Sequence, residues 1–186
     1  PGFGVFGAFQ ETDLTEVIKA IDTNIRAVHI LTSFFKGFLR HGMRVISSNV
    51  SSAYCLCSGG HWIGRLTTLS KVYVLQFDAA IWKELGVKTA AFSISALCPG
   101  PVNTEFDLKA DVTFTPASKP SYQIAEYALK QMFARRMLIV PGLQMKLAKC
   151  SARFLPTRAV LAVSYHLQHR RQPKRTAISK SLPRSN

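Results

Sequence analysis

Three polar residues of different chemistry stand where apolar segments of the sequence are interrupted or end. Asn24 lies inside an apolar run with helical spacing, Ser52 follows a β-branched run that ends at Val50, and Lys71 lies in a later helical run. A buried amide must find hydrogen-bond partners or cost about 1–3 kcal/mol. Taken singly, Ser52 would be an ordinary turn residue and Lys71 a solvated charge.

The elements that position these residues follow from periodicity and from turn residues. Apolar residues at spacings of three, four and seven predict a helix over 15–40, capped by Asp13 or Thr12 and ending near Gly42. Its wide apolar side is expected to be buried on a sheet and on a partner subunit. Further helices are predicted over 68–85 and 122–135. Strands are predicted over 44–50, 89–98 and 137–140, and the last two are stopped by Pro99-Gly100-Pro101 and Pro141-Gly142.

The order helix, strand, helix, strand, helix, strand predicts an α/β fold. Helices that alternate with strands at this spacing indicate parallel strands joined by crossover helices. In an open sheet of this kind, ligands bind beyond the carboxyl ends of the strands. Here those ends are Ser51-Ser52, Cys98–Thr104 and the loop after Val140.

The charge is divided unevenly along the chain. Residues 1–126 carry 11 Lys/Arg and 10 Asp/Glu, whereas residues 127–186 carry 13 Lys/Arg and no acidic residue. The basic character therefore belongs to the C-terminal part, and the rest is close to neutral. That part lacks the interleaved aromatic residues that stack on bases, so we expect no nucleic-acid partner.

The length of 186 residues and a hydrophobic fraction of 47% suit one globular domain. We expect this domain to occupy residues 1–142, followed by a basic amphipathic helical segment at 143–171 and a disordered basic tail at 172–186. No apolar run approaches the roughly 18 residues that span a bilayer, and no signal peptide is recognised. The four cysteines lack the spacing of a zinc site, so we expect no metal, free thiols and a reducing, cytoplasmic location.

The segment 143–171 allows two interpretations. It could lie on an anionic membrane surface, which would make the protein membrane-associated. Alternatively, its apolar side packs on the domain and its charges face water. Its apolar anchors are Leu143, Leu147, Phe154, Leu155, Val160, Val163 and Leu167, and its interleaved cations are Lys146, Lys149, Arg153, Arg158, Arg170 and Arg171.

Several short motifs, in a fixed order, resemble the short-chain dehydrogenase/reductase family. They are Gly2–Gly7, Asp22-Thr23-Asn24, Asn49-Val50-Ser51-Ser52, Ser70-Lys71-Val72-Tyr73 and Cys98–Thr104. Each is weak alone, but together they cover residues 1 to about 170. The resemblance implies a partial, doubly wound Rossmann-type parallel sheet with flanking helices. Because the sequence begins without Met and contains no Gly-x-x-x-Gly-x-Gly turn after a strand, it resembles the C-terminal portion of the family, without its N-terminal cofactor half.

The resemblance also implies a function and its residues. The family transfers a hydride between an alcohol or carbonyl substrate and NAD or NADP. We also expect a homo-oligomer, because a sheet without the family's first strands has an unpaired edge. By resemblance, Ser52 polarises the substrate oxygen, Lys71 supplies an ammonium that also holds the nicotinamide ribose, and Asn24 holds a water. Pro99, Gly100, Val102 and Thr104 would lie beside the nicotinamide.

Two departures predict that this chain is impaired as an enzyme. Thr67 stands four residues before Lys71, where the family has its catalytic tyrosine, and an aliphatic hydroxyl does not ionise near neutral pH. Tyr73 should point to a different side of the helix, and Tyr54 is a weak substitute. The second departure is the absence of the family's Gly-rich turn. The spacing Gly2-x-Gly4-x-x-Gly7 does not replace that turn, because no strand precedes these glycines. The alternative is a non-catalytic protein that keeps the fold.

Overall fold

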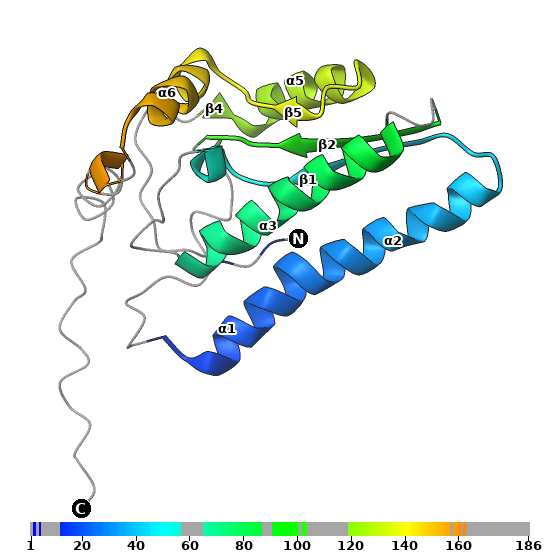
Figure 1. The fold of residues 1–186 in the computed structure, drawn as a ribbon, viewed down its shortest axis with the longest axis horizontal. Helices are drawn as coiled ribbons and strands as arrows, with labels where there is room; N and C mark the ends of the chain where they lie inside the picture. Colours follow the sequence, from blue (N-terminus) through cyan, green and yellow to red (C-terminus); the bar gives the residue numbers. More distant parts are fainter. Residues whose placement is uncertain are drawn as a thin grey trace, which may run out of the picture.

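The computed structural model describes residues 2, 4, 12–56, 65–86, 91–100, 102–103, 119–156, 158–160 and 162. The elements in it follow the predicted alternation, and their arrangement is shown in Figure 1. Among these residues, every helix is too short or too polar to reach across a bilayer.

The first helical region runs from residue 14 to residue 40 as one rod with an interruption. It consists of α1 (Leu14–Ile21), a π-helical turn (Asp22–Arg26) and α2 (Ala27–Arg40). At its start, Asp13 caps the helix by accepting a hydrogen bond from the Thr15 amide at 2.9 Å, as predicted. At its end, Gly42 takes a positive φ of 72°, and its amide and the next one bond back to the last turn. This is a Schellman ending, which favours glycine because a side chain is strained at that φ.

Three parallel strands form the sheet, in the order β1-β2-β5. They are β1 (Val45–Val50), β2 (Phe92–Leu97) and β5 (Leu138–Ile139). The register pairs Val45 with Phe92 and Val50 with Leu97. The expected partial Rossmann-type α/β sheet is therefore confirmed, although the second and third strands are shorter than predicted.

Helices cover both faces of this sheet (Figure 1). The helix α3 (Arg65–Ile81), which continues as a π-helical turn (Trp82–Gly86), packs with α2 against one face, and α5 (Ser121–Phe133) packs against the other. On the sheet face that α3 covers, an apolar core cluster lies at the amino ends of the strands. It consists of Val45, Phe92, Ile94, Phe35, Leu39, Ile81, Trp82 and Leu85. Toward the carboxyl ends of the strands, a second cluster contains Leu75, Ala96, Cys98 and Val140.

Some parts of the structure differ from the expectations. Ile18 and Ile21 are exposed, because the sheet lies alongside α2 and does not extend under α1, so the apolar side of the long helix is buried only in part. A two-stranded parallel pair, β3 (Val102–Asn103) with β4 (Lys119–Pro120), was not predicted, because two-residue strands leave no periodicity. The helix α6 (Leu143–Phe154) follows β5.

Candidate functional site

The carboxyl ends of β1 and β2 are tied together by backbone hydrogen bonds. The Ser51 amide donates to the Leu97 carbonyl at 2.7 Å, and the Ala53 amide donates to the Pro99 carbonyl at 2.9 Å. The short 3-10 helix Ala53–Leu56 then leads the chain away from β1. Two of the three predicted ligand-binding strand ends thus form one continuous edge.

The two serines at the end of β1 have different roles in the structure. Ser51 is buried, and its hydroxyl donates to the Lys71 carbonyl at 2.6 Å, so it joins the strand end to α3. Ser52 is half-buried, and its Oγ accepts a hydrogen bond from the Tyr54 amide at 3.3 Å. This bond occupies a lone pair of Ser52 and leaves its proton for donation to a ligand oxygen.

Lys71 reaches from α3 to the same strand end. Its ammonium donates to the Val50 carbonyl at 2.9 Å. Burial lowers the pKa of the Lys71 ammonium from its ordinary value of 10.5. An ammonium has three N–H donors, and only the one to Val50 is used among the described residues. The other two donors have no hydrogen-bond partner among the described residues.

Asn24 lies in the middle of the π-helical turn and is 1% exposed. Its amide donates to the hydroxyl of the buried Ser70 at 3.0 Å, across 46 residues of sequence. Single π-turns within α-helices are frequent at functional sites, because the inserted residue changes the direction of side chains and carbonyls. The amide that periodicity marked as needing a partner thus finds one next to Lys71.

Gly2 lies beside the same residues. A Cβ added to Gly2 would lie 3.6 Å from Lys71 Nζ and 3.9 Å from Asn24 Oδ1. The ammonium and the amide oxygen therefore face one small space beside the Gly2 backbone. The structure brings Asn24 and Lys71 together, with Ser52 just beyond Val50, the residue whose carbonyl Lys71 contacts.

The other predicted site residues are described less completely. Thr67 lies in the α3 backbone one turn before Lys71, and its side chain is outside what the structure describes. Thr104 lies outside the described residues. Pro99 and Gly100 follow β2, and Val102 begins β3.

Tyr73 is confirmed to point away from the candidate site. Its hydroxyl lies 2.7 Å from His29 Nδ1 on α2, and its ring stacks on Phe77 at 5.6 Å between centroids. It cannot take the place of the tyrosine that the family carries before its lysine.

Thiolate chemistry is disfavoured at Cys98. Cys98 is fully buried at the end of β2, and burial raises the pKa of its thiol to about 12. The group is therefore neutral at physiological pH and poorly nucleophilic.

One ionisable residue that sequence reasoning missed is Asp78 of α3. It is 0% exposed, and its Oδ1 accepts a hydrogen bond from the Asn49 amide of β1 at 2.7 Å. Its Oδ2 has no partner among the described residues, and burial raises the pKa of the carboxyl from 3.8 to about 7. A signal was present in the sequence, because Asp78 lies three residues after Leu75 and four before Trp82, on the apolar side predicted for that helix.

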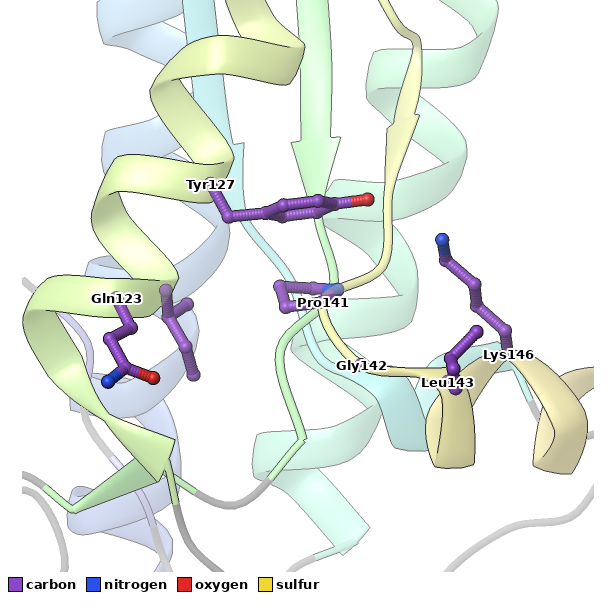
Figure 2. Close-up of a pocket in the computed structure, with 7 residues that line it drawn as sticks. Gln123, Tyr127, Pro141, Gly142, Leu143 and Lys146 are labelled. Atoms are coloured by element: carbon purple, nitrogen blue, oxygen red, sulfur yellow. The ribbon is translucent and has the colours of Figure 1, made fainter.

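A separate hollow of about 320 Å³ lies between α5 and α6 (Figure 2). Tyr127 projects into it from α5, toward Lys146 of α6, whose ammonium lies 5.9 Å from the ring centroid. None of the candidate site residues lines it. Since Lys71, Asn24 and Ser52 carry the ionisable and hydrogen-bonding groups at the strand ends, the candidate site is assigned there and not to this hollow.

Neither a protein-family model nor a curated protein matches the sequence. Solved structures do match the fold. A short-chain dehydrogenase from Sphingobium yanoikuyae in complex with NADPH superposes with a TM-score of 0.69 at 18% identity, over 96% of this chain and 66% of that one. One from Burkholderia cenocepacia in complex with NADP gives a TM-score of 0.72 at 14% identity, over 88% and 65%.

A third similar structure is a short-chain dehydrogenase/reductase from Burkholderia phymatum in complex with NAD, with a TM-score of 0.69 at 16% identity, over 95% of this chain and 67% of that one. The chain thus spans about two-thirds of the length of these three solved structures. At these identities the likeness concerns the fold. Over this span, the chain has the Rossmann-type fold of the short-chain dehydrogenases.

Proposed function

We propose that the edge formed by Ser52, Lys71 and Asn24 serves NAD(P)-dependent oxidation and reduction of an alcohol/carbonyl pair. The observation that carries this proposal is the meeting of the Lys71 ammonium and the Asn24 amide beyond the end of β1. Similar folds are known with NADPH, NADP and NAD bound, which supports the same cofactor class here. When bound, the nicotinamide supplies or accepts the hydride.

Each residue has a task that its surroundings allow. The two remaining donors of Lys71 suit the paired hydroxyls of a ribose, and its charge favours the loss of a proton from a neighbouring hydroxyl. The Ser52 hydroxyl donates a hydrogen bond to the substrate oxygen and polarises it. Asn24 is held by Ser70 beside Lys71, and by resemblance it holds a water. By resemblance, Pro99, Gly100, Val102 and Thr104 border the nicotinamide.

The proton that accompanies the hydride is the weak point of the site. Transfer at the substrate oxygen requires an acid or base whose pKa lies near the working pH. The hydroxyl of Thr67 does not meet this condition, and Tyr73 is engaged with His29. We therefore propose that activity of this chain is impaired, and Thr67 favours a second candidate function, that of a non-catalytic protein with this fold.

The 186-residue chain is expected to bind NADPH weakly, with a Kd near 1 mM, equivalent to about −4 kcal/mol. The reason is that Lys71 can bind the ribose, whereas the sequence contains no Gly-rich turn that would bind the pyrophosphate. Nicotinamide fluorescence titration measures the affinity. Lys71→Met should abolish binding, and Lys83→Met, at an exposed position on the turn after α3, should not. Low-micromolar binding, or equal effects of the two variants, would contradict the assignment.

We also propose that the chain is a homo-oligomer in the cytoplasm. Exposed aromatic residues gather on α2, where Phe34, Phe38, His41 and Met43 line a hollow of about 460 Å³. Contiguous exposed apolar surface of this kind marks interaction sites.

The double variant Phe34→Glu/Phe38→Glu is expected to lower the mass in light scattering to that of the monomer, because charges would be buried without partners. Leu129→Glu/Phe133→Glu adds the same charges to exposed apolar positions of α5 and should leave the assembly intact. A monomeric parent chain, or dissociation by both pairs, would rule out this surface.

A further inference from the structure

We propose that the outward side of α6 lies on an anionic membrane surface and attaches the protein to it. The contact is made by the α6 stripe, which we define as Leu143, Leu147, Cys150 and Phe154. This interaction is independent of the proposed oxidoreductase function, because it uses none of the residues assigned to that function.

The α6 stripe is a single apolar line on the helix. Its residues follow one another at spacings of four, three and four, which places them on one side of an α-helix. That side faces away from the protein. Leu143 is 76% exposed, Leu147 67% and Phe154 86%, and Cys150 is exposed as well.

The opposite side of α6 holds the helix in this orientation. Met145 packs against the core cluster of Leu75, Ala96, Cys98 and Val140. It also closes on the turn after β2, where a Cβ added to Gly100 would lie 3.0 Å from Met145 Cγ. The helix therefore cannot rotate to bury the stripe without withdrawing Met145 from the core. Of the two interpretations of this segment, full packing of its apolar residues on the domain is wrong for Leu143, Leu147, Phe154 and Leu155, although Val160 is buried.

The positive charges beside the stripe favour an anionic partner. Lys146 and Lys149 follow the stripe along one flank of α6 and are exposed. Residues 127–186 contain 13 Lys/Arg and no acidic residue, so no carboxylate of this part repels an anionic surface. An apolar line bordered by cations is typical of helices that lie in the interface of anionic lipids.

The neighbouring hollow suits the same partner. Leu143 belongs to the stripe and also lines the hollow between α5 and α6. Lys146 lines the same hollow opposite Tyr127 (Figure 2). The lining is mainly apolar, with Lys146, Gln123 and the Tyr127 hydroxyl as its polar groups. An anionic lipid headgroup could thus approach Lys146 while apolar chains contact Leu143.

Co-sedimentation of the full chain with vesicles tests this proposal. Vesicles of phosphatidylcholine that contain phosphatidylserine should bind at least tenfold more protein than vesicles of phosphatidylcholine alone, and binding should fall steeply with salt. Leu147→Glu should abolish binding. Leu129→Glu, at an exposed leucine of α5, should leave it unchanged.

Charge variants with equal net charge test the electrostatic part. Lys146→Glu/Lys149→Glu should weaken binding about tenfold or more. Lys36→Glu/Lys83→Glu, at exposed positions on α2 and after α3, should weaken it far less. Equal binding to both vesicle types, no binding to either, or equal losses in the paired variants would overturn the proposal. A change of oligomer mass caused by Leu147→Glu, without vesicle binding by the parent chain, would assign the stripe to self-association instead.

Discussion

A chain that carries both Thr67→Tyr and an added N-terminal Gly-rich nucleotide-binding half is expected to oxidise alcohols at least about 100-fold faster than either change alone allows. A positioned acid or base contributes typically 10²–10⁴-fold to a proton transfer. The tyrosine would lie one helical turn before Lys71, whose ammonium favours its ionised form. The Gly-rich half would hold the pyrophosphate at a helix N-terminus, so that the nicotinamide remains at the end of β1. Absorbance of NADPH, followed with a panel of alcohols and carbonyls, measures the rate.

Each change made alone serves as a control for the combined variant. Thr67→Tyr alone should give no measurable turnover, because the hydride donor is held only weakly. Thr68→Tyr in the extended chain is a matched control, since the next position along α3 faces a different direction. Clear turnover from Thr67→Tyr alone would show that the 186 residues already hold the cofactor. Equal rates with tyrosine at positions 67 and 68 would contradict the role assigned to position 67.

Asp78→Asn is expected to stabilise the protein at pH 8 by about 2 kcal/mol and to leave its stability near pH 4 almost unchanged. The folded protein raises the pKa of this carboxyl from 3.8 to about 7, because burial disfavours its charge. The folded state therefore keeps a proton that the unfolded state has lost, and the free energy of unfolding decreases as pH rises from about 3.8 to about 7. Asparagine is neutral at every pH and can still accept the hydrogen bond from Asn49.

Urea unfolding at a series of pH values provides the measurement. In the parent chain, the free energy of unfolding should fall across this window and stay level above it. Asp78→Asn should flatten the profile, whereas Glu84→Gln, an exposed acid on the turn after α3, should reproduce the parent. If Asp78→Asn destabilises the protein at pH 8 as much as at pH 4, the carboxylate is needed in its charged form and the assigned direction of the pKa is wrong.

Features that depend on neighbouring residues could be predicted from the sequence. The cap at Asp13 and the glycine ending at Gly42 were both recognised, because a cap or a turn is decided within about one helical turn. The alternation of helices and strands predicted the parallel sheet, since each crossover requires a helix between two strands. Asn24 was a candidate because it interrupts an apolar helical run, whereas Ser52 and Lys71 were candidates by the family resemblance.

Features that depend on contacts between distant segments needed the tertiary structure. The bond from Asn24 to Ser70 joins positions 46 residues apart, and the π-helical turn that carries Asn24 leaves no periodic signal. Ser51 and Ser52 look alike in the sequence, yet only the fold turns Ser51 toward the Lys71 carbonyl. The sequence by itself determined which residues stand at the strand ends and that α6 is amphipathic and basic. Only the packing of Met145 against the core decided that the α6 stripe faces outward, because burial of one side of a helix fixes the direction of the other.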